Sequence, residues 1–370
     1  MNRNDLLYKI ALASIYGVGS KIAQNLVAYA GGVREVFELN KKELANIPGV
    51  GTVIANRISD KKHLSEAEKQ LFFVEKYKIS SLFFTDADFP YRLKQCPDFP
   101  VILYGKGNMD LHKKRIVSIV GTRMITEYGK NICKSIIEQI RSFDEDILVV
   151  SGLAYGVDIN IHRACLKHNL QTVGVLGHGL NTIYPKTHRR EAEQMLQNGG
   201  LVTDFTNSDT FDRKNFVRRN RIIAGLADAT IVVESAESGG AMISAEIAQS
   251  YDRDVFAFPG DVSNKFSKGC HKLIKTNVAA LCENFADVVA AMCWDEDAKQ
   301  KLVQTELFPN LSQEEDAIII KLRNKKYFID ELAADMEMPV SKLSPLLLSL
   351  ELKGLIKSLP GNLYAINTTT

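Results

Sequence analysis

The basic run RKNFVRRNR, residues 213–221, is the segment whose chemistry best suits an anion. Arg218, Arg219 and Arg221 fall within four residues, and Phe216 stands among the basic side chains. A guanidinium is always charged and can bind two phosphate oxygens at once, whereas an aromatic ring offers a face to a nucleobase. A basic run is more often a solvated surface, so the chemistry depends on what lies beside it.

A turn of small residues follows the basic run at the end of an apolar segment. Thr230–Val233 has the β-branched composition of a buried strand, and Ser238, Gly239 and Gly240 then open a helix-like segment. Glycines in this position let backbone amides approach a phosphate, although tight turns need them in any case. Ligands of doubly wound sheets bind at the carboxyl ends of the strands, so the two features together favour an anion site.

Apolar runs separated by helix-length segments place this turn in a larger domain. Their alternation predicts an α/β domain with a doubly wound, mainly parallel sheet and helices on both faces. The predicted strands are residues 116–120, 147–150, 172–176, 201–205, 230–233, 255–257 and 278–281. The preceding segment, 80–109, contains three prolines that exclude a long helix, and it gives no further prediction.

The flanking segments predict two smaller domains. Residues 1–80 read as helices with two Gly-Val-Gly turns, at 17–19 and 49–51, which resemble helix-hairpin-helix elements that contact DNA phosphates. Such a hairpin can equally be structural. We therefore expect a helical domain over 1–80, the α/β domain over 81–293, a polar linker over 294–311 and a winged-helix-like domain over 312–370.

The carboxyl-terminal domain has few cations where a winged helix reads DNA. Its predicted recognition helix carries only Lys342 and Lys353, against Glu351. A helix that reads a DNA groove is normally more basic, so the sequence favours a protein-contact or regulatory role.

Composition limits the function further. The 370-residue chain has a formal net charge of +2, so any nucleic-acid surface must be local. Its six scattered cysteines form no CxxC pair, so we expect them to be reduced, without zinc or disulfides. We also expect a cytoplasmic protein with no membrane segment. GxGxxG is absent after the first predicted strand, so we expect no NAD, and we expect no other cofactor. No metal-ligand spacing surrounds the cysteines or histidines, so we expect no metal. We expect His162 and His178 to form core or turn hydrogen bonds.

Seven segments resemble the DNA-processing protein A family, also called DprA or Smf. They occur in family order as SIVGTR (118–123), SGLAYGVDINIH (151–162), VGVLGHGLNTIYP (173–185), FVRRNRIIAGLADATIVVES (216–235), SGGAMISAEIA (238–248), RDVFAFPG (253–260) and SKGCHKLIKTNVAAL (267–281). The resemblance implies a Rossmann-like domain that is not an enzyme. It implies a homodimer that binds single-stranded DNA without sequence preference and loads the RecA recombinase during natural transformation.

The resemblance also assigns residues to the DNA site. Matching positions imply that a basic pocket is lined by Arg123, Phe216, Arg219, Asn220, Arg221, Gly239, Gly240 and Lys268, and Arg218 joins them because of its charge. The late segment CHKLIKTNVAAL is the candidate dimer surface, unless it is a buried final strand and helix.

Three positions depart from the commoner family pattern, and one of them permits an alternative. Val217, Tyr155 and Glu246 stand where proline, arginine and a basic residue are frequent. Nucleotide phosphoribohydrolases share a related Rossmann-like fold with a Gly-Gly turn before a helix that holds a glutamate, and Glu246 could then assist departure of a base. The segment SGGAMISAE lacks the PGGxGTxxE form of those enzymes, so DNA binding is the favoured function.

Overall fold

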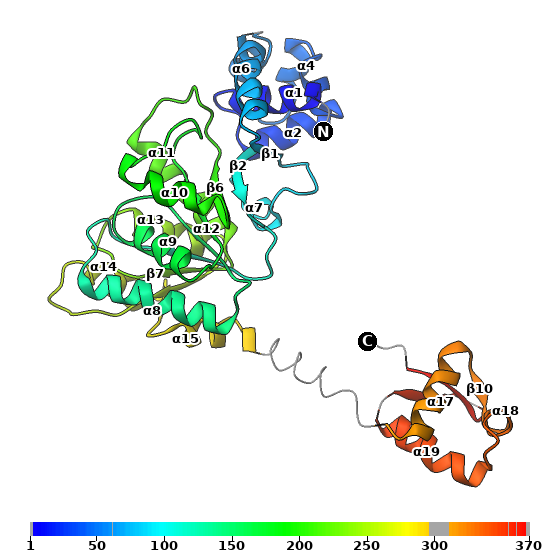
Figure 1. The fold of residues 1–370 in the computed structure, drawn as a ribbon. Coiled ribbons are helices and arrows are strands. Elements are labelled where there is room, and N and C mark those ends of the chain that lie inside the picture. Colours follow the sequence, from blue (N-terminus) through cyan, green and yellow to red (C-terminus); the bar gives the residue numbers. More distant parts are fainter. Residues whose placement is uncertain (1–2, 61, 296–310, 354, 360, 368–370) are drawn as a thin grey trace. The chain divides into compact units, whose positions relative to one another are not determined.

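The computed structural model describes residues 3–60, 62–295, 311–353, 355–359 and 361–367 (Figure 1). The chain forms two compact units, Met1–Met292 and Cys293–Thr370. The predicted linker falls almost wholly on residues 296–310, which lie outside the described residues.

A nine-stranded sheet organises the first unit. Its spatial order is β1-β2-β6-β5-β4-β3-β7-β8-β9, and every pairing from β6 to β9 is parallel. The strands are β1 (Ser80–Phe83), β2 (Ile102–Asn108), β3 (Ile116–Val120), β4 (Leu148–Ser151), β5 (Thr172–Val175), β6 (Gly199–Thr203), β7 (Ala229–Val232), β8 (Asp254–Ala257) and β9 (Ala280–Leu281). The predicted mainly parallel sheet is confirmed.

Strands β3, β4, β5 and β7 are buried along their whole length, as expected for parallel strands covered on both faces. All seven predicted strands are present, with ends shifted by at most two residues. The two strands that the sequence did not predict, β1 and β2, pair antiparallel to each other and add to the edge at β6. They lie on either side of the three prolines of this segment.

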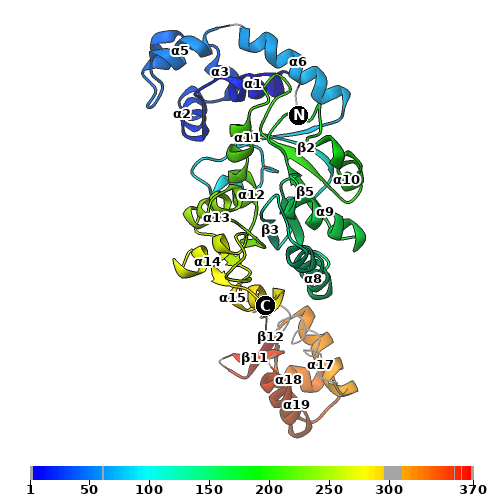
Figure 2. The ribbon, with the colours of Figure 1, turned by 90° about the vertical axis from the view of Figure 1, so that its left-hand side faces the viewer.

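Helices cover both faces of this sheet. Figure 2 shows α12, α13 and α14 on one side of the central strands and α8, α9 and α10 on the other. Their bounds are α7 (Tyr91–Lys94), α8 (Glu127–Phe143), α9 (Val157–Lys167), α10 (Arg189–Met195), α11 (Arg213–Arg218), α12 (Asn220–Leu226), α13 (Gly240–Ser250), α14 (Lys268–Lys275) and α15 (Phe285–Ala291), with a 3₁₀ turn at Lys186–His188.

The amino ends of β3 and β7 are joined through a buried ion pair. Arg92 of α7 is 1% exposed, and its Nε lies 2.7 Å from the Asp228 carboxylate. Asp228 also accepts the Ile116 amide at 2.8 Å, while Arg92 donates to the Lys113 and Lys114 carbonyls. Removing Asp228 would leave the buried Arg92 charge without its partner, so this pair fixes the segment between β1 and β2 against the amino ends of β3 and β7.

The amino-terminal helices pack beside β1 and β2. They are α1 (Arg3–Ser14), α2 (Ser20–Ala30), α3 (Val33–Val36), α4 (Lys41–Ala45), α5 (Thr52–Ile58) and α6 (Lys62–Lys76). Gly17 and Gly49 have φ angles of +96° and +82°, which only glycine adopts readily, and helices α2 and α5 begin three residues later. The two predicted helical hairpins are therefore present.

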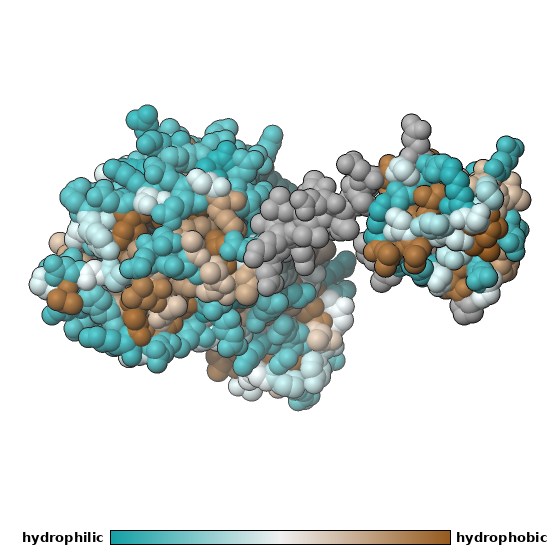
Figure 3. All heavy atoms as spheres, turned by 90° about the horizontal axis from the view of Figure 1, so that it is seen from below, coloured by the Kyte–Doolittle hydropathy of each residue, from teal (hydrophilic) through white to brown (hydrophobic). Residues whose placement is uncertain are grey.

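The described residues of the second unit form three helices and a three-stranded sheet. Its elements are α17 (Gln313–Asn324), β10 (Tyr327–Phe328), α18 (Ile329–Asp335), α19 (Val340–Leu352), β11 (Ile356–Leu359) and β12 (Leu363–Ile366). Strands β11 and β12 form the predicted β-pair, and Leu343, Leu347 and Leu350 of α19 pack in the core. Figure 3 shows apolar patches on this unit, which has Leu348 and Leu352 among its exposed side chains.

Candidate nucleic-acid interface

A cavity of about 270 Å³ opens at the carboxyl ends of β3 and β7. We call it the Arg219 pocket; it is lined by Gly121–Arg123 after β3, by Ala154 and Asp158, by the α11–α12 segment and by the turn that leads into α13. The chain runs outward from β3 in one direction to β6 and then returns to β3's other side as β7. This reversal of strand order is where doubly wound sheets bind their ligands.

Arg219 is the most buried cation of the pocket. It is 4% exposed, and its Nη2 lies 3.6 Å from an Asp158 oxygen. Its Nε and Nη1 have no hydrogen-bond partner among the described residues. Burial lowers the pKa of this guanidinium, and the Asp158 carboxylate opposes that shift. A buried donor without a partner is costly, so these N–H groups favour an incoming anion.

Gly152 creates the space that Arg219 occupies. A Cβ at Gly152 would overlap both terminal nitrogens of the guanidinium and an oxygen of Asp158. The Gly152 carbonyl in turn accepts a hydrogen bond from Nε2 of the fully buried His162, at 2.5 Å. Because Gly152 has no side chain, the turn after β4 leaves room for the Arg219 guanidinium.

Two exposed arginines complete the charge of the pocket. Arg123 follows β3 and Arg213 begins α11, and neither forms an ion pair with another described residue. Three guanidiniums therefore face Asp158, which is the one carboxylate among the described lining residues. This surplus of positive charge suits several phosphates better than one.

The amino end of α13 forms the opposite wall. Gly239 has a φ of +145° and precedes the helix without a side-chain cap. A Cβ at Gly239 would meet no atom within 4 Å, so the backbone here is open to a ligand. Asn220 donates from its amide to the Gly240 carbonyl at 3.2 Å, which ties this turn to α12. The first amides of α13 thus add a partial positive charge to the pocket.

An aromatic cluster adjoins the pocket. The Phe216 ring lies 5.4 Å from Phe211 and 5.6 Å from Tyr184, and Tyr184 lies 4.8 Å from Phe211, all between ring centroids. Phe211 and Tyr184 are 53% and 46% exposed, and His178 packs against both phenylalanines. Exposed rings beside free guanidiniums are suited to stacking unpaired bases.

The structure brings six of the nine predicted site residues together and leaves three apart. The Arg219 pocket includes Arg123, Phe216, Arg219, Asn220, Gly239 and Gly240. The residues outside its lining are Arg218, Arg221 and Lys268.

Each of these three has a different environment. Arg221 turns away from the pocket because it pairs with the Asp204 carboxylate and donates to the Asp98 carbonyl. Arg218 is exposed, and its guanidinium lies 5.2 Å from the centre of the Phe205 ring. Lys268 is exposed at the start of α14, next to Gly269, whose amide bonds the Ser235 carbonyl of the pocket wall. Arg221 is therefore not part of the predicted cationic pocket.

Three side chains suited to a nucleic acid, Arg213 of the pocket lining and Phe211 and Tyr184 of the aromatic cluster, were absent from the predicted site. Arg213 belongs to the same basic run, and Phe211 precedes it by two residues, so alternation of rings with cations was a usable signal. Tyr184 lies 32 residues before Phe216, and no local pattern connects the two.

Other polar groups near the sheet have structural partners. His162 lies 2.8 Å from the Thr172 hydroxyl, and His178 lies 2.9 Å from the Gly179 carbonyl, as expected for core and turn histidines. Glu246 is exposed on α13 and does not line the Arg219 pocket. The alternative that uses Glu246 as a catalytic acid has no support from this geometry.

Comparison with known proteins identifies the family. Residues 80–293, more than half of the chain, match the family model for DNA recombination-mediator protein A. The chain belongs to this family. Residues 305–362 match the DprA winged helix domain, and residues 9–61 match a SAM-like helix-hairpin-helix tandem. The predicted helix-hairpin-helix and winged-helix folds are therefore confirmed.

Members of the family resemble the chain along most of its length. Protein Smf of Synechocystis is 28% identical over 400 residues, covering 98% of this chain and 99% of that protein. DNA processing protein DprA of Streptococcus pneumoniae is 35% identical over 231 residues, covering 62% and 78%. The X-ray structure of the S. pneumoniae protein superposes with a TM-score of 0.65 and 30% identity, covering 78% of this chain and 98% of that one.

A second solved structure comes from a relative described for its binding of single-stranded DNA. DNA processing protein A of Helicobacter pylori, described for its unique single-stranded DNA binding mode, gives a TM-score of 0.53 and 25% identity, covering 59% of this chain and 97% of that one. In the described part of this chain, no helix has the length and apolar character needed to cross a membrane.

Proposed function

We propose that this protein binds single-stranded DNA without sequence preference through the Arg219 pocket and the adjoining aromatic cluster. The observation that carries the proposal is the buried guanidinium of Arg219, which has two donors free and lies beside exposed Arg123 and Arg213. Guanidiniums and helix amides contact phosphates, and ring faces accept any base, so this set of groups gives affinity without base choice. Single-stranded DNA binding by the H. pylori relative supports the same ligand class.

We further propose that the protein acts as a mediator and not as an enzyme, and that it loads a RecA-type recombinase on the bound strand in the cytoplasm during DNA uptake. Its family supports the mediator role. Two copies would hold one strand better than a single pocket, because the second contact forms at high effective concentration. The edge strand β9, where Leu281 is 49% exposed, is the candidate dimer surface.

A salt series tests the DNA proposal. Fluorescence anisotropy with labelled oligothymidylate should show an affinity that falls by about 0.7 log unit per log unit of salt for each phosphate contacted. Duplex DNA of the same length should bind more weakly, because its bases cannot reach the aromatic cluster. An affinity for single strands that is flat between low and moderate salt would reject the proposal.

Two further measurements test the assembly. Sedimentation at micromolar concentration should give a dimer that Leu281→Asp weakens, and a monomeric wild type would count against the dimer.

RecA loading should appear as a shorter lag of RecA ATP hydrolysis on a single strand coated with single-strand-binding protein. An unchanged lag would remove the mediator role and leave DNA binding intact.

A further inference from the structure

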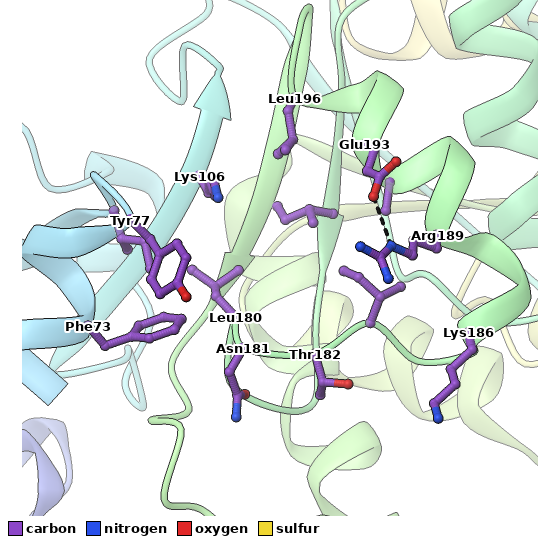
Figure 4. A pocket seen from close by; sticks show the side chains of 14 residues that line it. Phe73, Tyr77, Lys106, Leu180, Asn181, Thr182, Lys186, Arg189, Glu193 and Leu196 are labelled. Atoms are coloured by element: carbon purple, nitrogen blue, oxygen red, sulfur yellow. Dashed lines mark hydrogen bonds and ion pairs between the residues drawn. The ribbon is translucent and has the colours of Figure 1, made fainter. Parts of the chain in front are cut away.

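A second hollow of about 600 Å³ lies between the helical domain and the sheet (Figure 4). We call it the α6 groove; Phe73 of α6, Tyr77 just after that helix and Lys106 of β2 stand on one side. The other side is formed by residues 180–183, Lys186, Arg189, Ala192 and Glu193. Leu180, Leu196 and Leu201 supply apolar lining. Tyr77 is 44% exposed, so its ring is accessible from the groove.

The charge of the α6 groove is positive. Its lining contains Lys106, Lys186 and Arg189 against Glu193, and Arg189 already pairs with Glu193 at 2.8 Å. Neither Lys106 nor Lys186 forms an ion pair with another described residue. Lys106 lies 5.5 Å from the centre of the Tyr77 ring, so a cation and a ring face are presented together. This combination complements a polyanion that carries aromatic bases.

One loop joins the α6 groove to the site already described. Residues 181–183 and Lys186 line the groove, whereas Tyr184, between them, packs against Phe211 and Phe216 of the aromatic cluster. A DNA strand whose bases stack on Tyr184 is therefore next to the loop residue Lys186, two positions further along the protein chain, which is a cation of the groove.

We propose that the α6 groove binds the nucleotides that continue from the Arg219 pocket, with phosphates held by Lys106 and Lys186 and a base stacked on Tyr77. The inference rests on the proposed function, because the strand must first occupy the Arg219 pocket. It gives the amino-terminal domain a role in DNA binding through Tyr77, just after α6, and this role does not depend on its helical hairpins.

Two lengths of DNA separate this inference from the proposed function. The full chain and its Lys106→Ala/Lys186→Ala variant are titrated with oligothymidylates of about five and about fifteen nucleotides, lengths that bracket typical sites for one domain. For the longer strand we expect the variant to lose roughly tenfold in affinity and to lower the salt slope by about 1.4, the value for two phosphates. For the shorter strand we expect no change.

A matched control removes the same charge elsewhere. Lys134→Ala/Lys167→Ala takes away two exposed lysines of α8 and α9 that do not line the groove, and it should leave both affinities within about twofold of wild type. Tyr77→Ser should weaken the longer strand alone. Equal losses in the groove variant and the control would overturn the inference while the proposed function stands. Failure of the wild type to bind either oligonucleotide would overturn both.

Discussion

The Arg219 pocket and the α19 segment both contain cations, but the pocket has exposed cations without an ion pair in the described part of the chain, whereas Lys342 and Lys353 are both paired. On α19, Lys342 pairs with Glu314 at 2.6 Å, and Lys353, just after the helix, pairs with Glu315 at 2.6 Å. In the pocket, Arg123 and Arg213 have no ion pair among the described residues. A cation already held by a carboxylate has little to gain from a phosphate, so pairing decides which basic segment can bind DNA.

The same lesson applies within one helical segment. Arg219 and Arg221 are two residues apart, yet one has free donors and the other is neutralised by Asp204. Substitutions of free cations should therefore weaken DNA binding more than substitutions of paired ones.

The largest effect should come from the free arginines. Arg123→Ala/Arg213→Ala removes two exposed guanidiniums without disturbing a buried partner, and we expect a loss of at least a hundredfold, about 3 kcal/mol, in single-strand affinity for every sequence. Anisotropy titration measures it. The paired surface arginines in Arg34→Ala/Arg141→Ala provide the control. A loss that varied strongly with base sequence would contradict phosphate contact.

The two units should lose stability in different ranges of acidic pH. Burial lowers the pKa of His162 to about 4, although the Gly152 carbonyl and Asp158 oppose this. The folded chain thus favours the neutral His162 ring. This preference contributes about 2–3 kcal/mol to the free energy of unfolding above about pH 6.5, and the contribution is lost as the pH falls toward 4. The Lys353 ammonium lowers the pKa of Glu315 to about 2, so the carboxyl-terminal unit loses stability only below about pH 4.5.

Urea unfolding of the full chain, followed by circular dichroism between pH 7 and pH 3, measures both transitions. His162→Gln should reduce the change in the free energy of unfolding between pH 6.5 and 4.5. Glu315→Gln should change it only below about pH 4.5. A wild-type profile without a slope between pH 6.5 and 4.5 would show that His162 does not control stability.

A smaller loss should follow from the aromatic cluster. Tyr184→Ala and Phe211→Ala each remove an exposed ring, and we expect roughly tenfold weaker binding of single strands, since stacking contributes about 1–3 kcal/mol per base. The salt slope should stay unchanged because no charge is lost. A reduced slope in either variant would mean that the ring had only positioned a cation.

The smallest effect should come from α19. Lys342→Ala breaks an exposed ion pair with Glu314, and we expect less than about 1 kcal/mol in stability and less than twofold in DNA affinity. Binding that weakened as much as in the Arg123→Ala/Arg213→Ala variant would show that paired cations also bind the strand.

The sequence predicted the parallel sheet well because its strands are short and apolar, and the central ones are fully buried. It missed β1 and β2, since the prolines between them and the glycines within β2 obscure the strand pattern of this segment. Within the site, residues of the basic run and of the turns after β3 and β7 were found together. The fate of Arg221 was not predictable, because Asp204, which neutralises it, stands 17 residues earlier and only the folded chain brings the two together.

Gly152 also has an evolutionary meaning. Any side chain at this position would occupy the volume of the Arg219 guanidinium, so an alanine would displace the arginine without altering the net charge of the protein. Positions 152 and 219 should then be inherited as a pair: lineages that retain the arginine retain the glycine, and those that abandon one are released from the constraint on the other.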